Sequence, residues 1–188
     1  VRLDIGLPEE KAGRIPDQAW VRAQPQYNHG WLPGFTLNTI IGQGDVLSTP
    51  LQIAQLISTV AMNGHEVEPY LVAKIGDEVQ VPETREVPGD YYTTLKEGMR
   101  MMLTDFPSRS ILGPNAFPVS VAGKTGTAQT PRGGDYTHAW FMGFSPYEAP
   151  EVAVVVFIEY GGSSSRVAIP IARDFLAGYW RLHGVEVP

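Results

Sequence analysis

The chain has 188 residues, of which 43% are apolar and 10% aromatic, so it is large and apolar enough to bury one proper core, which excludes a disordered chain. Its 14 basic and 20 acidic residues give a net charge of −6, and no basic stripe is available to neutralise phosphates, which argues against nucleic acid as a partner. The absence of cysteine excludes disulfides and thiolate metal sites, and the longest apolar run, Val152–Ile158, is too short to span a bilayer.

The first 35 residues are rich in proline, glycine, glutamine and aromatic residues and have no sustained period. This composition predicts an irregular, packed coil with a short helical turn at Asp17–Arg22. His29 is isolated, because no second histidine stands at a spacing that metal ligands use. We therefore interpret it as a surface or capping histidine rather than as a metal ligand.

A helix start follows at Thr49. Thr49 is suited to the N-cap position, Pro50 to the first helical position and Gln52 to the return bond of a capping box, and the predicted helix continues to a stop at Gly64. The preceding Gly42-Gln43-Gly44 resembles a phosphate-binding loop only superficially, since it lacks the flanking strand, the further glycines and the lysine. A tight backbone turn is the better interpretation.

In the middle of the chain, the sequence predicts an exposed hairpin and a second helix. The hairpin joins residues 70–75 to residues 78–81 through Gly76-Asp77, and its charged residues indicate that it extends into solvent. The helix begins with Asp90 as its cap. Its apolar stripe has helical spacing. Met99, Met101 and Met102 are interpreted as core residues, because methionines at such spacing usually fill gaps in a core; a sticky partner surface is the alternative. The stripe is Tyr92, Leu95, Met99, Met102 and Leu103.

Three strands and a helix are predicted after the loop Phe106–Pro118. The first strand contains Lys124, and the second covers residues 138–144. The third, Val152–Ile158, is a nearly continuous β-branched run and is predicted to be buried on both faces. Short polar turns between them favour antiparallel pairing. The last helix has the predicted stripe Val167, Ile171, Phe175, Tyr179 and Leu182.

Gly161-Gly162-Ser163-Ser164-Ser165 precedes this last helix. The three serines have no lysine or histidine base beside them, so we interpret them as a turn and a helix cap rather than as a nucleophile. The predicted fold class is α+β: an antiparallel sheet made of the three C-terminal strands, packed by the C-terminal helix and by the two earlier helices. No linker divides the chain into two domains.

The segment with the clearest chemistry is Lys124-Thr125-Gly126-Thr127-Ala128-Gln129. A lysine fixed on a strand is a site for an anion. Gly126 has no Cβ, so a ligand backbone can approach the strand closely, and the amide of Thr127 is then free to point at a developing oxyanion. A three-residue motif occurs often by chance, so its strand context carries the argument, with a solvent-facing lysine as the generic alternative.

Taken together, the motifs resemble those of class B penicillin-binding proteins, and most closely those of the cell-elongation branch. Lys-Thr-Gly is a known motif of that group. The resemblance covers nearly the whole chain, in the expected order: Ile41-Gly42-Gln43-Gly44, Thr49-Pro50-Leu51-Gln52-Ile53-Ala54, Asn63-Gly64, Gly98-Met99, Ala122-Gly123-Lys124-Thr125-Gly126-Thr127-Ala128-Gln129, Ala139-Trp140-Phe141 with Gly143-Phe144, and Pro170-Ile171-Ala172.

The resemblance implies a penicillin-binding, β-lactamase-like fold and a D,D-transpeptidase that cross-links peptidoglycan through a serine acyl-enzyme. Its partners would be stem peptides, β-lactams and cell-elongation membrane proteins, with no cofactor or metal, at the outer face of the bacterial cytoplasmic membrane. Lys124 and Thr125 would bind the ligand carboxylate. Thr127 would add a hydroxyl contact and an oxyanion donor, and Gly126 and Gln129 would complete the site.

The chain departs from the family pattern in one respect: Ser-x-x-Lys and Ser-x-Asn, which supply the nucleophile and a proton relay, do not occur in it. Thr93-x-x-Lys96 and Thr36-x-Asn38 are near misses in the wrong context. We therefore expect residues 1–188 to be the C-terminal part of a transpeptidase domain, inactive alone and completed by the upstream part. The alternatives are a β-lactam sensor or a catalytically inactive penicillin-binding module, with a β-lactamase as a weaker one.

Overall fold

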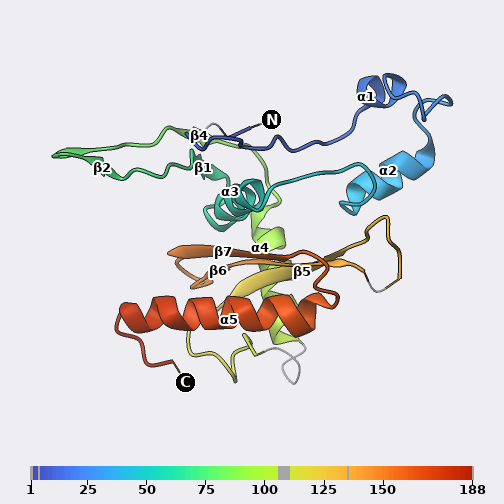
Figure 1. Cartoon of the computed structure of the whole chain (residues 1–188). Helices are drawn as coiled ribbons and strands as arrows, with labels where there is room; N and C mark the ends of the chain where they lie inside the picture. Colours follow the sequence, from blue (N-terminus) through green and yellow to red (C-terminus); the bar gives the residue numbers. More distant parts are fainter. Residues whose placement is uncertain (1, 4, 106–110, 135, 188) are drawn as a thin grey trace.

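The computed structural model describes residues 2–3, 5–105, 111–134 and 136–187, and it has the predicted α+β class (Figure 1). The predicted loop Phe106–Pro118 therefore lies partly outside the described residues. The elements in chain order are α1 (Gln18–Arg22), α2 (Pro33–Ile40), α3 (Pro50–Ala61), β1 (His65–Val67), β2 (Lys74–Ile75), β3 (Glu78–Val79), β4 (Thr84–Glu86), α4 (Tyr92–Thr104), β5 (Ala122–Ala128), β6 (His138–Ser145), β7 (Val152–Ile158) and α5 (Ser164–Leu182).

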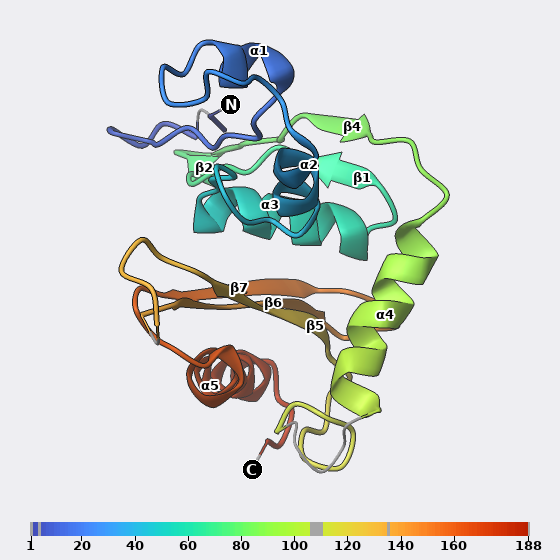
Figure 2. The same ribbon diagram turned by 90° about the vertical axis from the view of Figure 1, so that its right-hand side faces the viewer.

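The main sheet has the order β5-β6-β7 with antiparallel pairing throughout, which confirms the predicted three strands. Lys124 pairs with Met142 and Gly126 with Trp140. α5 covers one face of the sheet, α3 lies on the other face and α4 runs past the β5 side (Figure 2). Because β6 is central, β5 and β7 each leave one backbone edge without a strand partner in this sheet.

Two apolar clusters hold these layers together. The cluster on the α5 side includes Phe141, Leu176 and Leu103, all with no more than trace exposure, and the buried Trp180 indole donates to Ser145 Oγ at 3.1 Å. The cluster on the α3 side joins Ile57, Val60, Ala61, Tyr92, Met99, Ala122 and Phe144. Each face of the sheet is thus anchored independently.

The buried face of α5 differs from the predicted stripe. Ile171, Phe175 and Leu182 are exposed, and the helix instead buries Ala168, Ile169, Ala172, Leu176, Ala177 and Trp180. Three of these buried residues are alanines, whose small side chains let the helix backbone lie close to the sheet. Both faces of the helix carry large apolar residues at helical spacing, so periodicity alone did not identify the buried one.

The second helix and the third strand also differ in detail from the prediction. α4 has Tyr91 rather than Asp90 at its N-cap and no side-chain cap bond; Leu95 is exposed, whereas Met99 and Leu103 are buried. The core interpretation of the methionines is supported by the buried Met99 and the half-buried Met102, whereas Met101 is exposed. β7 is an edge strand whose α5 face, with Val154 and Val156, is buried, while its other face is half-buried against α3. The prediction of burial on both faces is therefore confirmed for one face and in part for the other.

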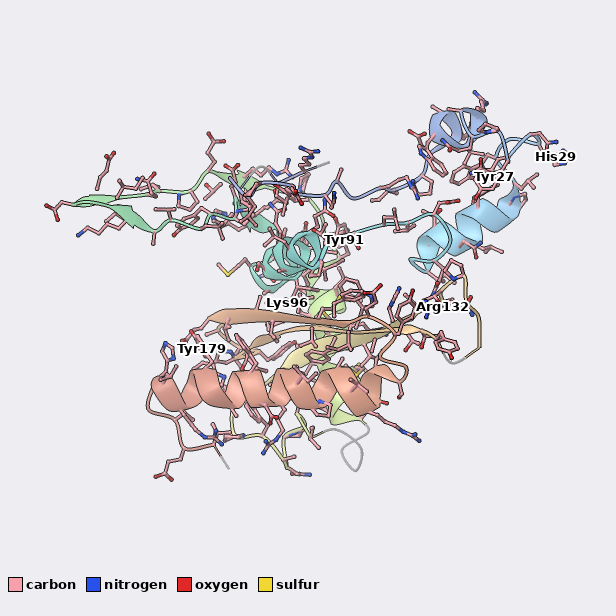
Figure 3. The ribbon with its side chains drawn as sticks, viewed as in Figure 1. Tyr27, His29, Tyr91, Lys96, Arg132 and Tyr179 are labelled. Carbon is pink, nitrogen blue, oxygen red and sulfur yellow. The ribbon has the colours of Figure 1, made fainter. Side chains whose placement is uncertain are left out.

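The first 45 residues contain one helix that the composition did not predict. α1 begins after Asp17, whose carboxylate accepts from Trp20 N, as expected for the predicted turn. α2 was missed, since its eight residues carry no capping side chain. Tyr27 lies between the two helices, where its ring meets Phe35 edge-on at 4.9 Å, and His29 is exposed at the far end of this region (Figure 3).

The helix start at Thr49 has the predicted capping box. Thr49 Oγ1 accepts from Gln52 N at 3.2 Å, and Gln52 Oε1 accepts from Thr49 N at 2.9 Å. Gly64 follows the helix with a φ of +99°, and a Cβ there would lie 2.6 Å from the carbonyl oxygen of Val87, so only glycine fits.

The predicted hairpin is present but short. β2 and β3 pair over two residues each, and all residues of these two strands are exposed. The hairpin extends from the small β1–β4 pair. Figure 1 shows it projecting away from α3, and we call residues 68–83 the arm. None of the described helices has both the length and the apolar character needed to cross a membrane.

Candidate active site

Lys124 lies on β5, the strand at one edge of the sheet, and its side chain is exposed. Its ammonium group donates to the carbonyl oxygen of the next residue, Thr125, at 2.7 Å. No carboxylate of the described residues forms an ion pair with it. Within the described part of the chain, its partner is its own backbone, and the ammonium is available to an anionic ligand, because a carboxylate adds an opposite charge that the neutral carbonyl lacks.

The open edge of β5 presents backbone groups of Thr125, Thr127 and Gln129. The Thr127 carbonyl and the Gln129 amide both bond to a group outside the sheet, which places them on the side away from β6. In an antiparallel strand, the N–H and C=O of one residue point the same way. The Thr127 N–H therefore faces the open edge too, as an oxyanion donor at this position requires.

The group outside the sheet is Gln43, which the sequence did not identify as a site residue. Its Nε2 donates to Thr127 O at 3.1 Å and its Oε1 accepts from Gln129 N at 3.3 Å. The tight turn Gly42–Gly44 is confirmed, since both glycines have a φ of +69°. Asp45 holds the turn from behind, because its carboxylate accepts from the Tyr27 hydroxyl at 2.7 Å and lies 3.8 Å from Arg14.

Ser164, at the start of α5, supports β5 from the face of the sheet that α5 covers. It is buried at 3% exposure, donates to the Gly126 carbonyl and accepts from Trp140 N at 3.3 Å. Its hydroxyl also lies 2.9 Å from Thr127 Oγ1, so the Thr127 hydroxyl points toward α5 rather than toward the open edge. The predicted helix cap is incomplete, because Ser163 occupies the N-cap position without a side-chain cap bond.

The glycines of the sheet have two different roles. A Cβ on Gly123 would lie 2.5 Å from the Phe141 ring, so this glycine is required for packing inside the protein. A Cβ on Gly126 would meet only the Trp140 Cβ, at the ordinary distance of 3.4 Å. Internal packing therefore does not require Gly126, and the space above it is open to a ligand.

The start of β5 is held by charged groups. The Arg100 guanidinium donates to the Val121 carbonyl at 2.8 Å. Ser120 bonds to the Glu148 carboxylate, and this bond, with a backbone N–H and the nearby Arg100, holds the pKa of Glu148 below its ordinary value. The Arg100 and Glu148 side chains thus fix the backbone at the start of β5, just before Lys124.

The near-miss motifs have structural roles. Lys96 Nζ donates to the Ala61 carbonyl and to Asn63 Oδ1, both at 3.2 Å, and so closes the C-terminal end of α3 (Figure 3). The Thr36 hydroxyl accepts from the Trp31 indole. No group of three or more histidine, aspartate or glutamate side chains suited to a metal ion occurs in the described part of the chain.

A cavity of about 1040 Å³ lies away from Lys124. It is bounded by the N-terminal segment, the start of α3 and the β1–β4 pair, and charged side chains of both signs, such as Arg14, Glu66 and Arg85, contribute to its wall. Lys124 and the rest of its motif are not part of that wall. The candidate site on the edge of β5 is thus separate from this cavity.

The sequence of residues 1–177 matches the penicillin binding protein transpeptidase domain family. The chain belongs to this family. Within it, the relatives identify the chain as part of the transpeptidase domain of an elongation-type, class B penicillin-binding protein. The peptidoglycan D,D-transpeptidase MrdA of Haemophilus influenzae is 30% identical over 93% of the chain, which spans 30% of that relative's length.

Solved penicillin-binding proteins have the same fold. One chain of a peptidoglycan synthase complex superposes with a TM-score of 0.82 at 43% identity, over 94% of this chain and 30% of that one. Penicillin-binding protein 2 of Helicobacter pylori, solved in complex with MreC, gives a TM-score of 0.82 at 26% identity, over 98% of this chain and 34% of that one. The predicted transpeptidase-like fold is confirmed.

Proposed function

We propose that this penicillin-binding protein chain supplies the ligand-binding strand of a peptidoglycan D,D-transpeptidase. The observation that carries the proposal is the presence, on one open strand edge, of two groups: the Lys124 ammonium, which has no ion-pair partner among the described residues, and the outward N–H of Thr127. The first suits a ligand carboxylate and the second suits a carbonyl oxygen that becomes an oxyanion. A peptide that ends in a carboxylate offers both groups a few ångströms apart.

The donor peptide would lie along β5 as an added antiparallel strand, with its carboxylate at Lys124 and Thr125. Its scissile carbonyl would then face Thr127, and Gly126 would let the two backbones approach. The Thr127 hydroxyl, which bonds to Ser164, serves to position the strand in this arrangement, and Gln129 marks its far end. β-Lactams would use the same groups, since they carry a carboxylate beside a reactive carbonyl.

The nucleophilic serine would come from an upstream part of the same transpeptidase domain, of which residues 1–188 form the C-terminal part. Acylation would then join the serine oxygen to the donor carbonyl carbon and release the terminal residue, after which an amine of a second stem peptide would take the acyl group. The site would work at the outer face of the cytoplasmic membrane, in contact with cell-elongation membrane proteins. MrdA and the MreC-bound relative support this assignment.

Fluorescent penicillin tests the proposal. The 188-residue chain should take no covalent label, whereas a version extended through the upstream serine should be labelled. Stable labelling of the 188-residue chain would contradict the assignment of the nucleophile. Failure of the extended, folded version to label would favour an inactive module, and a labelled version without turnover of D-Ala-D-Ala peptides would favour a sensor.

Lys124→Ala in the extended version tests the carboxylate anchor. Loss of a hydrogen bond to a charged group should lower the rate of acylation about ten- to hundredfold. Lys74→Ala is the matched control, because Lys74 is an exposed lysine of the arm whose only described partner is Asp77. Equal acylation of the two variants would remove Lys124 from the site.

A further inference from the structure

The contact between Gln43 and β5 has the geometry of strand pairing. One side-chain amide donates to Thr127 O and accepts from Gln129 N, which are the two bonds that one residue of a neighbouring parallel strand would make at this point. Gln43 comes from the turn between α2 and α3, 84 residues away from Thr127 in sequence. The side chain thus closes the edge of β5 beyond Thr127.

This bond coincides with one that a ligand needs. In an antiparallel pair, a ligand residue whose carbonyl accepts from Thr127 N–H donates its own N–H to Thr127 O. The proposed function places the reacting carbonyl at Thr127 N–H, so the amide N–H next to that carbonyl is directed at Thr127 O. Gln43 Nε2 already occupies this acceptor at 3.1 Å.

We propose that Gln43 is a specificity-determining residue that competes with the ligand amide for the Thr127 carbonyl and limits pairing along β5 to the residue opposite Thr127. This inference rests on the proposed function. Beyond Thr127, the Gln129 amide is held by Gln43 Oε1, so the rest of a ligand backbone turns away from the strand. The turn is fixed, because Gly42 and Gly44 are in the left-handed region and Asp45 is held by Tyr27 and Arg14.

The test uses the extended protein and two β-lactams. Benzylpenicillin carries an amide N–H on the carbon next to its reactive carbonyl, and penicillanic acid has the same ring and carboxylate without that amide. Gln43→Met removes both side-chain bonds at similar length. The rate of acylation by benzylpenicillin, divided by that of penicillanic acid, should rise about three- to tenfold in this variant, the effect of one freed hydrogen-bond acceptor.

Gln26→Met is the control, since Gln26 is exposed in the loop after α1. A ratio that stays at the wild-type value, or equal changes for both compounds, would mean that Gln43 only supports the fold and would overturn the proposal.

A second measurement does not depend on acylation. Hydrogen exchange at the Gln129 amide should become at least tenfold faster in Gln43→Met and stay unchanged in Gln26→Met. Unchanged exchange would contradict the contact itself. The extended wild-type protein could react with neither β-lactam while Gln129 exchange responds as expected. In that case the proposed function is wrong, and so is the proposed competition between Gln43 and the ligand amide. The closure of the β5 edge by Gln43 would still stand.

Discussion

The sheet and the arm are opposite kinds of structure within one chain. In the sheet, Phe141 and Leu176 are fully buried between β5–β7 and α5, and the indole of Trp180 has a polar partner in the core. In the arm, Ile75, Val79 and Val81 are 62%, 66% and 87% exposed. The proposed site lies on the sheet, where packing fixes the backbone of β5.

The comparison teaches where the chain can be altered without loss of the site. Burial of apolar surface stabilises the layers that position Lys124, whereas a hairpin with two-residue strands contributes little by itself. Local stability should therefore differ between the two regions, with the sheet opening only in global unfolding.

Phe141→Ala should have the largest effect. The ring is fully buried and lies across Gly123 and Gly143, so its removal leaves a cavity and should lower the free energy of unfolding by about 3–5 kcal/mol. Val79→Ala, in the arm, should change it by less than about 0.5 kcal/mol. Urea unfolding of both variants measures this, and equal effects would remove the distinction between the regions.

Gly123→Ala should have the next largest effect on the free energy of unfolding, because the added Cβ would lie 2.5 Å from the Phe141 ring. We expect a loss of about 1–3 kcal/mol from overpacking. Gly126→Ala should leave the unfolding free energy nearly unchanged, yet slow acylation of the extended protein by crowding the ligand strand. A destabilised Gly126→Ala, or one that is acylated at the wild-type rate, would contradict the role assigned to this glycine.

Ser164→Ala should weaken the attachment of β5 to α5. It leaves the Gly126 carbonyl without its side-chain donor, and the expected loss is about 1–2 kcal/mol by thermal or urea unfolding. Ser165→Ala, at an exposed neighbour, should be close to neutral. A neutral Ser164→Ala would show that the sheet holds β5 without help from the helix.

Glu148→Gln should have the smallest effect, and one that depends on pH. Because the pKa of Glu148 is lowered in the folded state, its ionised form stabilises the fold at neutral pH, and this contribution is lost as the pH falls through the folded-state pKa. The variant should lose about 0.5 kcal/mol at pH 7, as for an exposed charged contact, and should lose less further stability on acidification. If the wild-type protein and the variant lost stability in parallel as the pH falls, Glu148 would not contribute to the pH dependence of stability.

The sequence predicted those elements whose signals are local. The capping box at Thr49, the β-branched run of β7 and the glycine stop at Gly64 each depend on residues a few positions apart, and each is present in the structure. Lys124 was placed on a strand for the same reason. The motifs in chain order were enough to indicate the family.

Tertiary structure decided what depends on distant partners. The buried face of α5 combines three alanines with larger apolar residues, and periodicity alone did not separate it from the exposed face, which also carries large apolar residues. Gln43 and Ser164 reach β5 from segments far away in sequence, and both looked like ordinary turn residues. Composition and spacing determined a positively charged strand, but only folding decided which side chains hold its backbone, because those bonds form between residues that the sequence keeps apart.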